Sequence, residues 1–221
     1  MAEIDPQTDS VIREIDEELK QERYEKLWKK YGGYVIGAAL ALVIGVAGFK
    51  GWQHWDIQTR TEQSTRYVAA AELIQAKDIQ GARDAFAALA EDAGSGYAML
   101  ARFQQAGLLV REGAKEEAVA AYRDLADDES LDAAHRDLAR VIEGLIAVEG
   151  ENLDGIEGRL GTLLQGTNPW RHLAKEILAI AAHRRGDATS ALAMYKELSE
   201  DADAPSGVRA RATEMLAVLG A

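Results

Sequence analysis

One uncharged stretch constrains this chain more than any other feature: residues 31–49 read YGGYVIGAALALVIGVAGF. At about 1.5 Å of rise per residue, a helix of this length spans roughly 28 Å, close to the thickness of the hydrocarbon core of a bilayer. Aromatic residues flank the stretch, with Trp28 before it and Trp52 and Trp55 after it, and such rings suit the headgroup region. We therefore predict an uncleaved transmembrane helix over residues 31–49.

A cleaved signal peptide and a buried globular helix are the two alternatives for this stretch. Thirty residues rich in acid precede it, and Lys50, Gly51 and Trp52 make a poor cleavage site after it, which argues against a signal peptide. A globular helix rarely lacks polar residues over such a length.

The basic residues around the span predict its orientation. Five Lys or Arg residues lie in the fifteen positions before it, and only Lys50 and Arg60 lie in the sixteen positions after it. This bias places the N-terminus in the cytoplasm and the C-terminal domain outside the inner membrane, which is the periplasm in a Gram-negative cell. The expected domains are a cytoplasmic amphipathic segment (1–30), the transmembrane helix (31–49), a juxtamembrane linker (50–61) and a repeat domain (62–221).

Small residues recur every four positions within the span, at Gly33, Gly37, Ala41 and Gly45. This spacing lets two helices approach closely, so it predicts lateral contact with a second copy or with another membrane protein. The alternative is that glycine and alanine are simply common in membrane spans.

The composition of the remaining chain favours helices and excludes several kinds of chemistry. Alanine, leucine, glutamate and arginine dominate it, with few prolines. The net charge of −12 argues against a nucleic-acid partner, because phosphate backbones repel an acidic domain. The absence of cysteine excludes disulfides, thiol chemistry and Cys-type zinc sites.

The C-terminal part contains an internal repeat with a period of about 36 residues. Three segments share a small residue, an aromatic residue four positions later and a leucine three positions after that. These triplets, which we expect to form the repeat core, are Ala82/Phe86/Leu89, Ala118/Tyr122/Leu125 and Ala191/Tyr195/Leu198. A turn residue lies five positions before each triplet, at Lys77, Gly113 and Gly186. A degenerate copy is expected between the second and third, with a turn at Gly150, the small position at Gly155 and Arg159 at the aromatic position.

Each copy predicts a pair of helices joined by a left-handed turn residue. The first helices are expected at 62–76, 96–111, 132–148 and 169–185, and the second helices at 79–91, 114–126, 152–164 and 188–200. Asn168 before Pro169 reads as a cap followed by the first helical residue. A closing helix at about 205–219, beginning with Pro205, would cover the last apolar layer.

The residue choice and spacing over 62–219 resemble the tetratricopeptide repeat. The prediction is therefore an all-α chain, with one transmembrane helix followed by an α-solenoid of about four tetratricopeptide-like helix pairs and a C-terminal capping helix. Apolar residues on the first helices are candidates for a partner surface that holds extended chains, although ordinary core packing also explains them; they are Tyr67, Phe103, Leu173 and Ile180.

The whole layout is similar to that of the ancillary SecYEG translocon subunit family. The features that carry this resemblance are the short cytoplasmic segment, the span ending in GFKGWQHW, the degenerate repeats and the segment GYAMLARFQQAGLLV from Gly96 to Val110. The resemblance implies an inner-membrane protein that associates with the translocon and with a membrane-anchored periplasmic chaperone of the prolyl-isomerase type. It also implies a role in passing newly exported proteins to periplasmic chaperones.

Motifs for catalysis or cofactor binding do not occur in the sequence. None of the four histidines has metal-ligand spacing, and there is no nucleophile elbow, phosphate loop or dinucleotide fingerprint. We therefore expect no enzyme activity, cofactor, metal or small-molecule substrate. The expected function is a membrane-tethered protein-interaction module beside the export translocon, with a chaperone-like or scaffolding role. The alternative is a scaffold for cell-envelope assembly or division that binds only folded partners.

Overall fold

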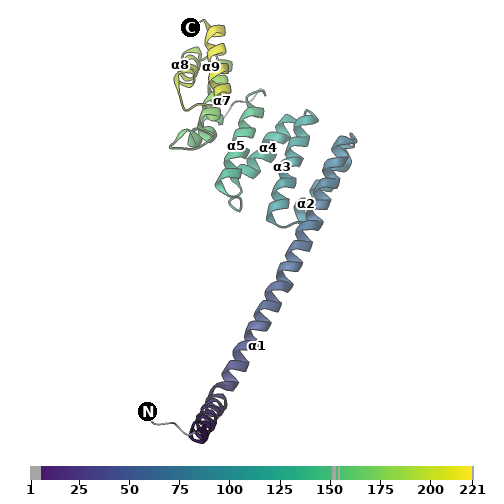
Figure 1. Ribbon diagram of the computed structural model, residues 1–221. Coiled ribbons are helices and arrows are strands. Elements are labelled where there is room, and N and C mark those ends of the chain that lie inside the picture. Colours follow the sequence, from purple (N-terminus) through teal and green to yellow (C-terminus); the bar gives the residue numbers. More distant parts are fainter. Residues whose placement is uncertain (1–5, 151–152, 154, 221) are drawn as a thin grey trace. The chain divides into compact units, whose positions relative to one another are not determined.

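Helices dominate the computed structural model, which describes residues 6–150, 153 and 155–220 (Figure 1). Side chains are described from Tyr24 onward, apart from those of Val35 and Ser95, so much of the predicted amphipathic face of segment 1–30 lies outside the described residues. The helices are α1 (Pro6–Gln75), α2 (Ile79–Asp92), α3 (Ser95–Arg111), α4 (Lys115–Asp127), α5 (Ala133–Ala147), α6 (Ile156–Gly161), the short 3₁₀ helix η1 (Thr162–Leu164), α7 (Arg171–Arg184), α8 (Ala188–Glu200) and α9 (Ser206–Leu219). No strand occurs among the described residues, and the predicted all-α architecture is confirmed.

Two compact units divide the chain, residues 1–61 and residues 62–221. Most of α1 belongs to the first unit, and the last residues of the same helix begin the second. Residues 50–61, predicted as a linker, are helical and continue α1. The end of α1 therefore serves as the first helix of the repeat array.

In three of the helix pairs, a residue in the left-handed backbone region joins the first helix to the second. Lys77, Gly113 and Gly186 have φ values of 64°, 80° and 81°, and they lie between α1 and α2, α3 and α4, and α7 and α8. A left-handed residue ends the first helix and satisfies its last carbonyl groups. Asp78 and Asp187 then cap α2 and α8, because each side chain accepts a hydrogen bond from a backbone N–H in the first turn.

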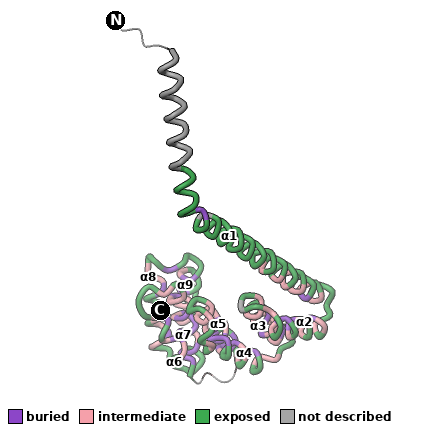
Figure 2. The backbone as a smooth tube through the Cα atoms, turned by 90° about the horizontal axis from the view of Figure 1, so that it is seen from below, coloured by how far each residue is buried: buried purple, intermediate pink, exposed green. Residues whose placement is uncertain are grey.

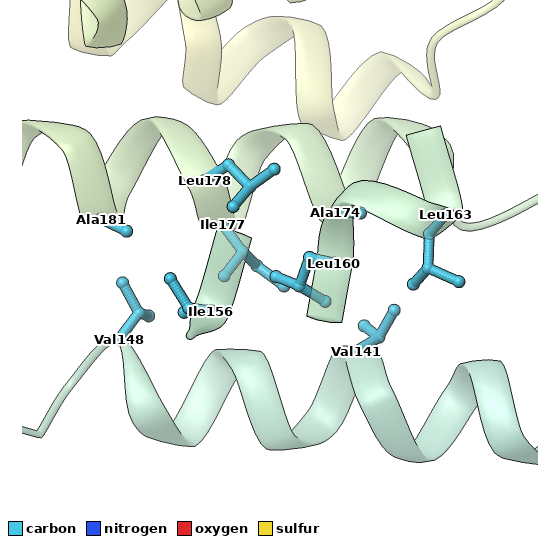
Figure 3. Close-up of a cluster of buried hydrophobic side chains, with 9 residues drawn as sticks. All are labelled: Val141, Val148, Ile156, Leu160, Leu163, Ala174, Ile177, Leu178 and Ala181. Carbon is cyan, nitrogen blue, oxygen red and sulfur yellow. The ribbon is translucent and has the colours of Figure 1, made fainter. Parts of the chain in front are cut away.

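The buried hydrophobic residues belong to the helices and connections of the second unit, as the colours of the backbone in Figure 2 show, and they form clusters between successive helices. Phe86 lies in the cluster that joins the end of α1 to α2 and α3, and Tyr122 lies in the cluster that joins α3, α4 and α5. Leu160 belongs to the cluster between α5, α6, η1 and α7, shown in Figure 3. Tyr195 packs between α7, α8 and α9. The core therefore runs along the array as a series of layers, as expected for stacked repeats.

The third helix pair departs from the predicted turn. Gly150 does not have a positive φ; the left-handed residue of this connection is Gly155, with a φ of 75°. Because α6 begins only at Ile156, the connection between α5 and α6 is longer than those of the other pairs. The predicted second helix at 152–164 is thus replaced by the shorter α6 followed by η1.

The repeat motif of this pair is also displaced by one residue. Ile156, Leu160 and Leu163 are buried, at the same spacing of four and then three residues as the predicted triplets. Arg159, predicted at the aromatic position, is only partly buried and points its guanidinium at acidic side chains. Gly155 precedes the helix and does not hold the small position.

Gly144 allows α5 to pack closely against Leu160, the residue at the aromatic position of this pair. A Cβ at Gly144 on α5 would lie 2.8 Å from Cδ1 of Leu160 on α6, and 3.4 Å from Cγ2 of Ile177 on α7. A glycine at this position of α5 therefore leaves the space that Leu160 fills.

Two predicted helix starts differ slightly from the observed ones. The helix expected from Pro169 begins at Arg171, and Oδ1 of Asn168 accepts a hydrogen bond from the N–H of Trp170 at 2.9 Å. Asn168 therefore organises a turn before α7. The closing helix α9 begins at Ser206, with Pro205 in the cap position.

Candidate protein-interaction surface

The apolar stretch lies within α1, and its side chains are exposed. Among the described residues, the part of α1 from Tyr24 to Gln75 is long and apolar enough to cross a membrane. The large side chains of Ile36, Leu40 and Ile44 are 53%, 58% and 69% exposed. A bilayer would supply the apolar surrounding that such a surface favours.

The small residues of this stretch are also exposed. Gly33, Gly37, Ala41 and Gly45 lie on the surface of α1, and a Cβ built at any of the three glycines has open space around it. Contact of this face with another helix stays a prediction.

The residues predicted for the repeat core are all buried in the second unit. They are Ala82, Phe86, Leu89, Ala118, Tyr122, Leu125, Ala191, Tyr195 and Leu198. Two of the aromatic members belong to equivalent edge-to-face pairs, Tyr67 with Phe86 and Phe103 with Tyr122, with ring centroids 5.4 Å and 6.0 Å apart. Each member of the second pair follows its counterpart by 36 residues, so the same contact between two helices recurs in successive repeats.

The structure places the four predicted partner-surface residues against the core clusters. Tyr67 and Phe103 are half-buried in the pairs just described, and the hydroxyl of Tyr67 accepts a hydrogen bond from the side-chain amide of Gln104 at 2.8 Å. Leu173 and Ile180 are half-buried on α7. Each residue therefore contributes to packing, and its role in binding a partner stays a proposal.

Other apolar side chains of the second unit are more exposed than those four. They are Val68, Leu100, Val110, Leu145 and Val218. Leu100 lies one turn before Gln104 on α3, where the sequence pattern assigned no binding role. Comparing the two sides of each predicted helix for apolar residues outside the core stripe would have identified them.

A buried carboxylate organises the junction between the second and third pairs. Glu143 on α5 is 4% exposed; its Oε1 accepts from Nε of Arg123 at 3.0 Å, and its Oε2 accepts from Nε of Arg159 at 2.7 Å. Asp127 accepts from the terminal nitrogens of Arg159 at 3.1 Å and 3.2 Å. Burial disfavours the charged form of Arg159, but these bonds outweigh it and raise its pKa. The network joins α4, α5 and α6.

A second buried carboxylate lies where the earlier repeats have an aromatic ring. Glu176 on α7 precedes Tyr195 by 19 residues, the separation of Tyr67 from Phe86 and of Phe103 from Tyr122. Both its oxygens accept hydrogen bonds from Arg211 on α9, at 2.6 Å and 2.7 Å, and these bonds raise the pKa of Arg211. Burial, and then the charge of Glu176, raises the pKa of Tyr195. The closing helix is thus joined to the array by a bidentate ion pair.

Basic residues on the first helices bind aspartates at the ends of the second helices. Arg66 donates to Asp92 at 3.2 Å, and Arg102, 36 residues later, donates to Asp128 at 2.5 Å. The bond from Arg102, with those from Ser130, lowers the pKa of Asp128 to about 2. Arg102 occupies a position that is usually buried in such repeats, and its ion pair with Asp128 explains how a charged residue is accommodated there.

The described residues contain no group of three or more His, Cys, Asp or Glu side chains that could hold a metal ion. His172 is buried, and its Nε2 lies 3.0 Å from Oδ2 of Asp201, so it joins α7 to the connection before α9. Several charged side chains of the unit instead pair with one another between helices.

The family model for the tetratricopeptide repeat-like domain matches residues 25–158, which include the apolar stretch, the first two helix pairs, α5 and the start of α6. No curated protein and no solved structure matches the chain.

Proposed function

Because this chain belongs to the tetratricopeptide repeat-like domain family, we propose that it is a membrane-tethered protein-interaction module beside the protein-export translocon. It holds newly exported chains, or scaffolds the proteins that receive them. In this proposal the chain lies in the inner membrane, with its N-terminus in the cytoplasm and its repeat domain in the periplasm. Domains of this family generally mediate contacts between proteins.

One observation carries the proposal: the apolar stretch and the first helix of the repeat array belong to the single helix α1. A membrane anchor confines the repeat surface to a thin layer beside the bilayer, which raises its effective concentration toward chains that emerge there. Weak contacts with many clients then suffice. Exposed apolar side chains such as Leu100 and Leu145 provide contacts without strict sequence demand.

The translocon and the membrane-anchored chaperone enter through the similarity of layout described above. The basic residues before the span support the proposed orientation, because such residues are retained in the cytoplasm. A function in handling unfolded chains requires in addition that the repeat unit bind extended segments.

Photo-crosslinking in native membranes tests the proposal. A photoreactive residue is placed at Leu100, which is exposed on α3, and the matched control carries it at Thr189, which is exposed on α8. During pulse-labelled export, we expect the first position to form adducts with translocon components and with chains that have not yet folded. Adducts with folded proteins alone would favour the scaffold for envelope assembly or division. An absence of adducts with any export component would contradict the proposal.

A further inference from the structure

A pocket of about 300 Å³ lies between the starts of α7 and α9. Most of its wall is apolar, and the residues that form this wall are Pro169, Trp170, Leu173, Pro205 and Val208. The two prolines have no backbone N–H to donate. The pocket therefore offers a ligand an apolar surface near the end of the array.

The two ionisable side chains that line the pocket, among the described residues, are already paired with carboxylates that do not line it. Nε2 of His172 lies 3.0 Å from Oδ2 of Asp201. Arg211 donates to both carboxylate oxygens of Glu176, at 2.6 Å and 2.7 Å. A charged group that entered the pocket would lose its hydration without gaining an unpaired counter-ion. The pocket therefore favours an uncharged, apolar occupant.

The size of the pocket suits one large side chain. A cavity of about 150 Å³ admits a benzene ring, so about 300 Å³ is enough for the side chain of a phenylalanine. Small-molecule ligands are oriented by a few precisely placed polar groups, whereas the ionisable groups here are committed to Asp201 and Glu176. The ring of Trp170 provides a surface against which an aromatic side chain can pack.

The pocket occupies the repeat position that also places Leu100 on the surface of α3. Trp170 and Leu173 follow Tyr97 and Leu100 by 73 residues, which is the separation of the core tyrosines of the same two repeats. The ring of Tyr97 packs against that of Tyr67, with centroids 6.1 Å apart. No ring of the described residues makes such a contact with Trp170. A position that the chain fills with its own aromatic pair in α3 is thus left open at α7.

An exposed side chain of this size distinguishes an unfolded chain from a folded one. Folded proteins bury most of their phenylalanine side chains, whereas a chain that has just left a membrane pore exposes them. A site for a single such residue places no demand on the neighbouring sequence. It therefore suits an extended client better than the surface of a folded partner.

Resting on the proposed role in protein interaction, we propose that this pocket binds one large apolar side chain, with phenylalanine as its best ligand, from an unfolded segment of a client protein. The side chain enters between Trp170 and Val208, and the residues beside it stay in solvent. A charged residue at the same point of the segment is excluded, because the pocket has no unpaired charge to receive it.

Fluorescence anisotropy with the full chain in nanodiscs tests this site. The probe is a short labelled peptide with blocked ends and one central phenylalanine among serines and glycines. Three matched peptides carry serine, glutamate or lysine in place of the phenylalanine, and empty nanodiscs measure adsorption to lipid. We expect the phenylalanine peptide to bind at least about tenfold more tightly than each of the other three, because only its side chain gains from leaving water. Equal binding of the four peptides, or tighter binding of a charged one, would overturn the proposal.

Two variants and two matched controls locate the site. Gly207 is exposed in the first turn of α9 and lines the pocket, and a Cβ built there meets only a terminal nitrogen of Arg211, at 3.5 Å. Gly207→Leu therefore fills the pocket, and its control is Gly158→Leu on α6, where a Cβ has open space. Leu173→Ala and its control Leu192→Ala each shorten one half-buried leucine, inside and outside the pocket. We expect affinity to fall at least about fivefold in both pocket variants and to stay unchanged in the controls.

Trp170 reports directly on what enters the pocket, because it is the only tryptophan within residues 62–221. The measurement uses a full chain in which Trp28, Trp52 and Trp55 are replaced by phenylalanine. A peptide whose central residue is bromophenylalanine should quench the emission of Trp170 on binding. Adding Gly207→Leu should remove this quenching. Quenching that persists in that variant would place the ring elsewhere and overturn the assignment.

Three outcomes separate the inference from the function on which it rests. If the pocket variants bind the peptide like their controls, while the wild-type chain still crosslinks to export components through Leu100, the pocket assignment fails and the proposed function stands. Selective binding at the pocket without any crosslink to an export component would support the site and contradict the proposed function. Should Gly207→Leu change the oligomeric state in sedimentation, the occupant is a second copy of this chain, and the client proposal is overturned. A circular-dichroism melt shows whether Gly207→Leu folds, and Leu173→Ala decides the matter if it does not.

Discussion

The repeat motif places a buried hydroxyl at Tyr195, where packing requires only an aromatic ring. Tyr195 is 1% exposed, and its oxygen has no hydrogen-bond partner among the described residues. Tyr122, at the equivalent position, points its hydroxyl toward the carbonyl of Phe103 at 3.5 Å. A buried polar group without a partner carries the full cost of its desolvation.

Removing this hydroxyl should therefore not destabilise the repeat unit. We expect Tyr195→Phe to leave the free energy of unfolding unchanged or to raise it by up to about 1 kcal/mol. Tyr195→Ala removes the ring from a closed layer and should lower it by about 3–5 kcal/mol. Chemical denaturation followed by circular dichroism measures both. A large loss of stability in the phenylalanine variant would show that the hydroxyl has a partner.

The contact between Gly144 and Leu160 allows a test by double substitution. Gly144→Ala should destabilise the unit by about 1–3 kcal/mol, because its Cβ would lie 2.8 Å from the buried leucine. In a Leu160→Ala background the same substitution should cost almost nothing, since the methyl group then fills vacated space. Equal costs in the two backgrounds would contradict the packing described for the third pair.

The buried carboxylates show what a residue pattern alone cannot predict. Glu143 and Glu176 look like ordinary surface glutamates in the sequence, because charged residues are rarely buried without partners. Their partners lie 16 to 35 residues away on other helices, and no local spacing identifies those contacts. By contrast, the core triplets obey a fixed spacing within one helix, so the sequence alone was enough to propose them.

Among elements, the connection from α1 to α2 differs from its counterparts by its turn residue. Lys77 has a φ of 64°, where Gly113 and Gly186 occupy the equivalent positions. A residue with a Cβ pays about 1–2 kcal/mol for this conformation, whereas glycine adopts it freely.

Substitutions at Lys77 and Gly113 should change the free energy of unfolding in opposite directions. We expect Lys77→Gly to raise the free energy of unfolding by about 0.5–1 kcal/mol and Gly113→Ala to lower it by about 1–2 kcal/mol. Urea titration of each variant provides the comparison. A loss of stability in Lys77→Gly would mean that the lysine side chain makes a compensating contact.

Most helix boundaries could be predicted from turn glycines and caps, and the largest failure is at the third pair. The turn at Gly150 was inferred from a constant repeat length, but the third pair changes both its connection and its second helix. In this pair Gly144 on α5 leaves the space that Leu160 on α6 fills. Periodicity within one helix contains no information about such a contact, because the two residues lie on different helices.

On the scale of the whole molecule, α1 joins an exposed apolar stretch to the repeat array. The length, lack of charge and aromatic flanks of that stretch predicted a membrane span without any knowledge of the fold. The identity of the partners lies beyond the sequence, because a repeat surface gains its specificity from residues that no motif specifies.

The basic residues around the span determine the orientation that we expect for it. Five Lys or Arg residues precede the span within fifteen positions and two follow it within sixteen, so the repeat unit should lie outside the inner membrane. A reporter that is active only in the periplasm, fused after Ala221, should be active.

Replacing Lys26, Lys29 and Lys30 by glutamine leaves two basic residues on each side of the span and should give mixed orientations. We expect a fall in periplasmic activity and the appearance of activity from a cytoplasmic reporter. As a control, replacing Glu17, Glu18 and Glu22 by glutamine should leave the orientation unchanged, because acidic residues contribute little to it. Activity of the cytoplasmic reporter alone in the unmodified chain would invert the topology and remove the basis for a periplasmic function.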